Sequence, residues 1–318
     1  MVATVPEQHG QCHTAPVPRA VVAAYLGCAL IWGTTWYAIR VSIAAYPTLI
    51  AVALRFAIAA AILLPLAARI RPWPRGRTWA WLALAGAFDA AAYLLVYLGE
   101  ERIPGAVAAV LYGTQPLILA VLLTATRIER LTQRHMIGAV VSLCGVTVLF
   151  LDRLDISANQ ATGVAMVLCS VVVATLYSMI IKQKASALPH LVTAAVFLTV
   201  TALLLGVVAL IAPGKVPWPP PASPTLALLY LALVGTVGAF GLFFWLLGKV
   251  TLQVSSTLVF VFPLIALVTD ALFEREIPLT ARAYIGAAVT LGGLAVSLRP
   301  AIARGRAQRL NALRAPDR

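Results

Sequence analysis

The sequence predicts an all-α membrane protein with ten transmembrane helices, arranged as two inverted-topology five-helix repeats. Three observations predict this fold: the composition, the regular recurrence of apolar runs, and an internal repeat. Of the 318 residues, 61% are hydrophobic and 11% are charged, and the mean hydropathy is +0.93. This is more apolar surface than a water-soluble domain can bury, so the composition indicates a chain whose solvent is the bilayer.

The apolar runs have the length that a membrane helix needs. A hydrocarbon core of roughly 30 Å is crossed by about 20 apolar helical residues. Because the runs are continuously apolar and do not alternate with period two, they favour helices over a β-barrel. The predicted spans are approximately 20–40, 47–67, 78–98, 103–125, 134–151, 162–182, 190–212, 225–247, 251–272 and 281–299.

The polar segments divide the chain between these spans. We predict a cytoplasmic N-terminal tail at 1–18, a first repeat at 19–151, a periplasmic linker at 152–161, a second repeat at 162–299 and a basic cytoplasmic tail at 300–318. The first apolar run is long enough to cross the bilayer, which favours a retained helix over a cleaved signal peptide.

The net charge of +13 is explained by topology. Most of the 24 Lys and Arg residues fall in alternate loops and tails, on the side that also holds both termini. By the positive-inside rule this side is cytoplasmic, so the expected location is a bacterial-type inner membrane with both termini inside. The basic tail lacks interleaved aromatic residues, so we expect contact with anionic lipid and no nucleic-acid partner.

The cysteines Cys12, Cys28, Cys144 and Cys169 show no paired spacing, and three of them fall inside predicted spans. We therefore expect no disulfide, no metal site and no cofactor. Cys12 beside His13 is the one adjacent pair that could bind a metal, and a single pair in a tail is a weak signal.

An internal repeat links the two halves. Residues 131–145 (LTQRHMIGAVVSLCG) and 279–293 (LTARAYIGAAVTLGG) align without a gap and share Leu, Thr, Arg, Ile and both glycines. The match extends backward, where Pro116 pairs with Pro263 after a shift of one residue. Since each repeat would contain an odd number of spans, the second copy enters the membrane inverted, an architecture common in secondary carriers.

These motifs resemble the EamA-type domains of the drug/metabolite transporter superfamily. The resemblance rests on LIWGTTWYAIR at 30–40, LRFAIAAAILLP at 54–65, the two central prolines and the Glu-then-Gly pattern from Glu129 to Gly145, and it covers residues 20–299 in two copies. It implies ten helices, cytoplasmic termini, a central cavity between the halves and, often, export of amino acids or other small metabolites. Small multidrug carriers of this superfamily use a first-helix carboxylate for proton coupling; span one here contains no Asp or Glu.

Arg55 and Asp89 are ionisable residues inside predicted spans, each about 12 to 14 Å from the periplasmic end. Such side chains face the bundle interior or a water-filled cavity. One interpretation is a structural ion pair that joins spans two and three. The other is a cavity site in which Arg55 attracts a carboxylate and Asp89 an amine or a coupling proton, with Asp270 a weaker proton-coupling candidate.

Further candidates for a substrate cavity are aromatic and polar residues of the central spans. Pro116 and Pro263 are hinge candidates, because a mid-span proline frees a backbone carbonyl and permits bending; a static kink is the alternative. The candidate cavity residues, besides Arg55 and Asp89, are Trp32, Trp36, Tyr93, Tyr112, Gln115, Tyr177, Ser255 and Ser256.

The predicted function is a secondary active transporter that exports amino acids or other small organic metabolites or drugs by alternating access, with proton coupling as one option. A Walker sequence is absent, so ATP hydrolysis is not supported. A lipid or headgroup-carrier flippase is the alternative, and an intramembrane enzyme is disfavoured because no span holds a catalytic Ser with His or paired carboxylates. The expected partners are a small molecule and the bilayer; monomer and homodimer both stay open.

Overall fold

The computed structural model describes residues 18–103, 105–126, 133–149, 158–211 and 214–273, and in the last predicted span residues 282, 285–286 and 288–296. Helices and turns account for these residues, and no strand occurs among them. Seven helices are long and apolar enough to cross a membrane. The protein is therefore an all-helical, multi-pass membrane protein.

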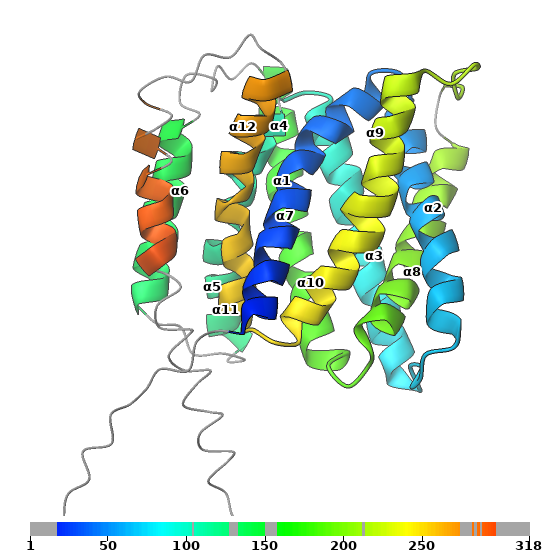
Figure 1. Cartoon of the computed structure of the whole chain (residues 1–318), viewed down its shortest axis with the longest axis horizontal. Helices are drawn as coiled ribbons and strands as arrows, with labels where there is room; N and C mark the ends of the chain where they lie inside the picture. The colour runs from blue at the N-terminus through cyan, green and yellow to red at the C-terminus, as the bar shows by residue number, and fades with distance from the viewer. Residues whose placement is uncertain are drawn as a thin grey trace, which may run out of the picture.

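The helices form one bundle (Figure 1). Their bounds are α1 Arg19–Ile43, α2 Thr48–Ala68, α3 Arg77–Glu100, α4 Gly105–Tyr112, α5 Gln115–Thr126, α6 Gln133–Leu149, α7 Ala158–Lys184, α8 His190–Leu210, α9 Ala222–Ala232, the π-helix η2 Leu233–Gly238, α10 Ala239–Leu247, α11 Leu252–Ser256, the 3₁₀-helix η3 Thr257–Phe260 and α12 Phe262–Phe273.

The seven spans correspond to seven of the ten apolar runs. Of the other three, α6 has 17 residues, the run at 251–272 is interrupted by η3, and the run at 281–299 is only partly described. The count of ten thus stays a prediction. The tails, most of the linker, Glu129 and the side chain of Asp270 lie outside the described residues, as do Cys12 and His13.

Two predicted spans are broken near the middle, and each break is followed by a proline. Span four divides into α4 and α5 at a turn in which the Gly113 amide donates to the Val110 carbonyl at 2.9 Å. The region of span nine divides into α11, η3 and α12. Pro116 and Pro263 are each the second residue of the segment after the break, where a missing N–H costs no helical hydrogen bond.

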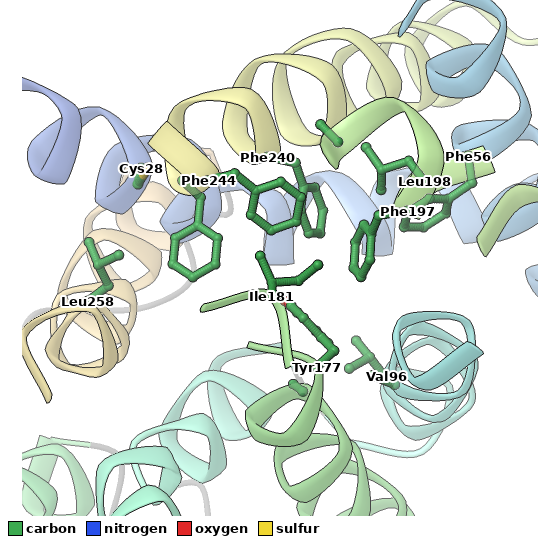
Figure 2. Close-up of a cluster of buried hydrophobic side chains, with 14 of the residues drawn as sticks. Cys28, Phe56, Val96, Tyr177, Ile181, Phe197, Leu198, Phe240, Phe244 and Leu258 are labelled. Carbon is green, nitrogen blue, oxygen red and sulfur yellow. The ribbon is translucent and has the colours of Figure 1, made fainter. Parts of the chain in front are cut away.

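The long helices pack side by side in layers. α3 lies along α7, α2 lies along α8, and α1 contacts α9, α10 and α12. Small residues permit the close approach that drives association inside a membrane: a Cβ on Gly86 of α3 would come within 2.7 Å of the Phe197 carbonyl oxygen of α8. Buried aromatic side chains fill the space between these layers (Figure 2).

The segment that contains α6 stands at one edge of the bundle (Figure 1), packed against the described part of the last predicted span. The Ser142 hydroxyl donates to the Thr290 carbonyl at 3.0 Å, and glycines on both segments face the opposite backbone. This edge contact is the junction of segments that the internal repeat aligns with each other.

Candidate functional site

A cavity of about 90 Å³ lies at the centre of the bundle, between the two broken spans. α1 and α3 to α5 form one part of its wall, and α7, α10 to α12 and η3 form the other. The wall residues are Trp32, Thr35, Trp36, Ile39, Ala92, Tyr93, Val96, Tyr112, Gln115, Leu119, Ala174, Thr175, Tyr177, Ser178, Phe243, Leu252, Ser255, Ser256, Leu258, Val259 and Phe262.

All of the candidate cavity residues from the sequence lie on this wall except Arg55 and Asp89. Tyr112 and Gln115 flank the break between α4 and α5, and Ser255 and Ser256 end α11 at the other break. Helix ends therefore lie at the cavity, and each end carries the partial charge of its helix dipole.

Aromatic rings within the wall pack against one another. The Trp32 ring lies 5.0 Å from the Phe243 ring and 5.9 Å from the Phe262 ring, and the Trp36 ring lies 5.2 Å from the Tyr112 ring, all in edge-on geometry. Behind Tyr177, the rings of Phe197, Phe240 and Phe244 point toward one another (Figure 2). Edge-to-face contacts of this kind fix ring orientation, so the wall is a rigid aromatic surface.

The wall carries no charged side chain among the described residues. Its hydroxyl groups bond back to their own helices: Thr35 donates to the Trp32 carbonyl at 2.7 Å, and Ser178 donates to the Ala174 carbonyl at 3.0 Å. Thr175, Ser255 and Ser256 do the same. The cavity therefore offers a ligand aromatic faces, hydroxyl oxygens and helix ends.

Arg55 is buried in a separate polar cluster. Its Nε donates to Thr236 Oγ1 at 2.8 Å and its guanidinium also donates to the Gly235 carbonyl at 3.2 Å, both in η2. Tyr97 accepts a third, longer hydrogen bond at 3.4 Å, and the Tyr93 ring lies 4.8 Å from the guanidinium carbon. These contacts tie α2 to the widened turn of η2 and to α3.

Thr236 makes two hydrogen bonds within and across the π-helix. Its hydroxyl donates to the Leu231 carbonyl five residues earlier at 2.8 Å, while its oxygen accepts from Arg55. A π-bulge of this kind is typical of functional positions in helices. Gly235 permits the approach, since a Cβ there would come within 3.0 Å of Thr35 Cγ2 on α1.

Asp89 is also fully buried, at the interface of α3 with α8. Thr201 donates to its Oδ2 at 3.0 Å, and its Oδ1 has no hydrogen-bond partner. In the described part of the chain no ion pair joins Asp89 to Arg55, so the direct structural pair is not formed. Arg55 bonds to η2 and to Tyr97 of α3, whereas Asp89 accepts from Thr201 of α8.

Sequence reasoning missed several wall residues and one buried acid. Thr35 and Ile39 follow Trp32 and Trp36 at helical spacing, so the 3.6-residue period could have found them. Glu100, the last residue of α3, is 6% exposed, although its position at a span end suggested contact with water. No cluster of three or more metal-ligating side chains occurs among the described residues.

Comparison with known proteins places the chain among transporters. The EamA-like transporter family matches residues 19–151 and 161–299. An uncharacterized transporter of Archaeoglobus fulgidus is 27% identical over 84% of this chain and 95% of its own length. The uncharacterized inner membrane transporter YedA of Escherichia coli is 25% identical over 79% of this chain and 80% of its own.

Two further proteins resemble the chain. Protein PecM of Dickeya dadantii is 28% identical over 80% of this chain and 84% of its own length. A solved crystal structure superposes with a TM-score of 0.71 over 90% of this chain and 98% of that chain, at 22% identity, a likeness of fold alone.

Proposed function

This chain belongs to the EamA-like transporter family, and on that premise we propose that it is a secondary active transporter that exports a small organic molecule, such as an amino acid or another metabolite or drug. The observation that carries the proposal is the central cavity, whose wall contains both broken spans. Broken helices around a central site are a recurring design of secondary carriers. Alternating access across an inner membrane is the mechanism that we infer.

The proposed architecture is ten helices in two inverted halves. A reciprocal contact supports it: a Cβ on Gly145 would meet the Thr290 amide nitrogen at 2.5 Å, and a Cβ on Gly293 would meet the Ser142 amide nitrogen at 2.5 Å. In the internal repeat Gly145 aligns with Gly293 and Ser142 with Thr290, so each segment makes the contact that its counterpart makes. Such exchange of roles is the mark of a two-fold axis.

A second reciprocal contact involves the neighbouring spans. A Cβ on Gly86 of α3 would lie 2.7 Å from the Phe197 carbonyl oxygen of α8, and a Cβ on Gly235 of η2 would lie 3.6 Å from Arg55 Nη2 of α2. The repeat aligns Gly86 with Gly235 and Phe197 with Arg55. The pairing of these segments supports the same two-fold relation, although the contacting atoms differ.

The wall chemistry favours a compact neutral or zwitterionic substrate. No charged side chain among the described residues faces the cavity, whereas the N-terminal ends of α5 and α12 bring positive partial charge to the wall and the C-terminal end of α4 brings negative partial charge. The volume of about 90 Å³ is below the roughly 150 Å³ of an engineered cavity that holds benzene. A drug-sized molecule would require the halves to move apart.

The alternative of a lipid flippase depended on an arginine that faces the cavity. An anionic headgroup would use Arg55 in a side-open cavity, but the guanidinium is occupied by Thr236, Gly235 and Tyr97 and is absent from the cavity wall. We therefore retain the small-molecule transporter as the single proposal.

Asp89 is the residue that the proposal assigns to proton coupling. In Asp89→Asn the amide oxygen can still accept from Thr201, so we expect a folded protein with nearly unchanged melting in detergent. We expect pH-gradient-driven transport to fall at least tenfold, because an amide cannot exchange a proton. Wild-type transport in this variant would remove Asp89 from the coupling mechanism.

Proteoliposome counterflow with a panel of amino acids, sugars, nucleosides and cationic drugs tests the function. Trp36→Phe, which alters the cavity wall, should raise the KM for any transported compound. Trp218→Phe is the matched control, because Trp218 is 90% exposed and distant from the wall. Absence of counterflow for the whole panel, or equal effects of the two variants, would contradict the proposal.

A further inference from the structure

Glu100 is a buried carboxyl group that the proposed transport site does not use. It is the last residue of α3 and is 6% exposed. Neither of its carboxyl oxygens has a hydrogen-bond partner in the part of the chain that the structure describes. A buried carboxylate without a donor is costly, by several kcal/mol. The group must therefore carry a proton or gain a new donor when it is charged.

Glu100 lies directly behind the cavity wall. A Cβ placed on Gly105, the first residue of α4, would come within 3.3 Å of Glu100 Oε2 and within 3.4 Å of the Trp36 Cβ. Trp36 is a wall residue, so the carboxyl group sits where α1, the end of α3 and the start of α4 meet. Glycine at 105 leaves the space that the carboxyl group fills.

The face of α3 that carries Glu100 is continuous with the cavity. Asp89, Tyr93, Val96 and Glu100 recur at helical spacing, and Tyr93 and Val96 line the cavity between the two acids. At 1.5 Å per residue, the acids are separated by about 16 Å along the axis. The two buried carboxyl groups thus flank the cavity along one helix.

The charged and titratable groups around Glu100 come from four helices. Arg40 of α1 and Arg55 of α2 interact with it electrostatically, as do Tyr97 of α3 and Tyr112 of α4. None of them gives either oxygen a hydrogen bond. A small shift of α1 or α4 could bring a hydrogen-bond donor to the carboxyl group, because α1 carries Arg40 and α4 carries Tyr112.

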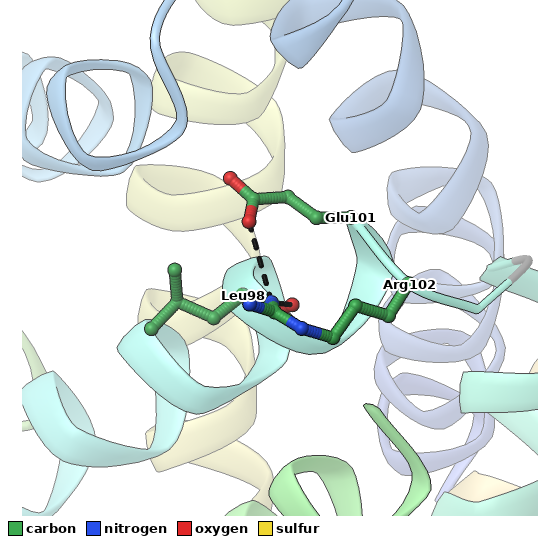
Figure 3. Close-up of polar contacts among 3 residues, drawn as sticks. All are labelled: Leu98, Glu101 and Arg102. Carbon is green, nitrogen blue, oxygen red and sulfur yellow. Dashed lines mark hydrogen bonds and ion pairs between the residues drawn. The ribbon is translucent and has the colours of Figure 1, made fainter. Parts of the chain in front are cut away.

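Glu101, the acidic residue next to Glu100, lies in a different environment. The Glu101 side chain is 37% exposed and its Oε2 lies 3.3 Å from an Arg102 guanidinium nitrogen, which also donates to the Leu98 carbonyl (Figure 3). Glu101 is thus a solvated, paired carboxylate one residue away. It is a matched control for any test of Glu100.

We propose that Glu100 is a proton-binding site of this carrier, placed behind the cavity at the end of α3. In the conformation described here its carboxylate has accepted one proton and is neutral. When α1 and α4 move relative to α3, the carboxyl group releases that proton to water. A donor that this movement brings near then forms a hydrogen bond with the charged carboxylate. This inference rests on the proposed transport function, for which Glu100 would supply a proton to exchange for substrate.

Infrared spectroscopy of the full-length protein in lipid nanodiscs tests proton binding directly. Over a pH titration, the wild-type protein should show the carbonyl band of a protonated carboxyl group, and Glu100→Gln should lose that component while Glu101→Gln keeps it. Glu100→Asp should restore a shifted band. Identical bands in the wild-type protein and Glu100→Gln, both monodisperse in detergent, would overturn the proposal.

A transport measurement separates this proposal from the function itself. In proteoliposomes with the panel above, Glu100→Gln should reduce pH-gradient-driven movement at least tenfold and retain counterflow, which moves no net proton. Loss of both processes would contradict a coupling role. If the wild-type protein transports no compound of the panel, the transport function fails, whereas the infrared titration still decides whether Glu100 binds a proton.

Discussion

At the residue scale, three buried ionisable side chains differ in the number of their hydrogen-bond partners. Arg55 has three hydrogen-bond acceptors and an aromatic face, Asp89 has one donor, and Glu100 has none among the described residues. A buried charge is stable in proportion to the dipoles that surround it. We therefore infer that Arg55 is a structural tie, and we propose that Asp89 and Glu100 are the groups whose protonation changes.

Thr236→Val tests the structural role of Arg55. Valine keeps the shape of threonine but removes the acceptor of the Arg55 Nε proton, so a buried charged donor loses a partner at a cost of about 1–3 kcal/mol. We expect a lower melting temperature for the purified protein in detergent. Thr124→Val is the control, because the Thr124 hydroxyl donates only to the Ala120 carbonyl of its own helix. Equal melting of the two variants would contradict the role.

At the element scale, the broken spans are the features that position the cavity. A proline at the second residue of α5 and of α12 begins a new helical segment where a continuous helix would otherwise run through. The segments before and after each break therefore have their ends at the cavity wall. If these breaks also bend during transport, changing their prolines should change the turnover rate.

Pro116→Ala and Pro263→Ala test the hinge proposal. Alanine supplies the missing N–H and favours a straighter helix, so each variant should slow counterflow turnover several-fold while substrate affinity changes little. Pro65→Ala is the control, since Pro65 lies inside α2 and away from the cavity. Unchanged turnover in both hinge variants would leave the breaks as static kinks.

The edge contact of α6 is a second test at this scale. In Gly293→Ala the new Cβ would meet the Ser142 backbone nitrogen at 2.5 Å, which overpacks the contact at a cost of about 1–3 kcal/mol. Gly292→Ala is the matched control, because a Cβ there meets nothing within 4 Å. Thermal melting in detergent should separate the two variants. Equal melting would mean that this contact adds nothing to stability.

At the scale of the whole molecule, the charge distribution and the internal repeat predict the topology. The positive-inside rule predicts that both termini lie in the cytoplasm, and an odd number of spans in each half would make the second half enter the membrane inverted. Two inverted halves can exchange conformations across the membrane, which is the physical basis of alternating access. Both statements depend on topology that can be measured directly.

A C-terminal alkaline phosphatase fusion tests the topology. The enzyme is active only outside the cytoplasm, so a fusion at the C-terminus should be silent, whereas a fusion within the linker at 152–161 should be active. An active C-terminal fusion would overturn the orientation if the linker fusion is silent, and the number of spans after the linker if the linker fusion is active.

The sequence alone determined the class of protein and most of the residues that form the cavity wall. Hydrophobic length identifies membrane helices, and prolines interrupt them, because both effects are local to the chain. Hence the positions of the long spans and the breaks at Pro116 and Pro263 could be predicted, as could most of the aromatic and polar wall residues.

Only the tertiary structure decided which way the buried polar groups face. In a membrane protein the lipid-facing and core-facing sides of a helix are both apolar, so hydropathy carries no signal about orientation within the bundle. Arg55 and Asp89 lie on neighbouring helices of the first half, yet each bonds to a helix of the second half. Glu100 is buried close to Gly105, which begins another helix, and no local pattern predicts that proximity.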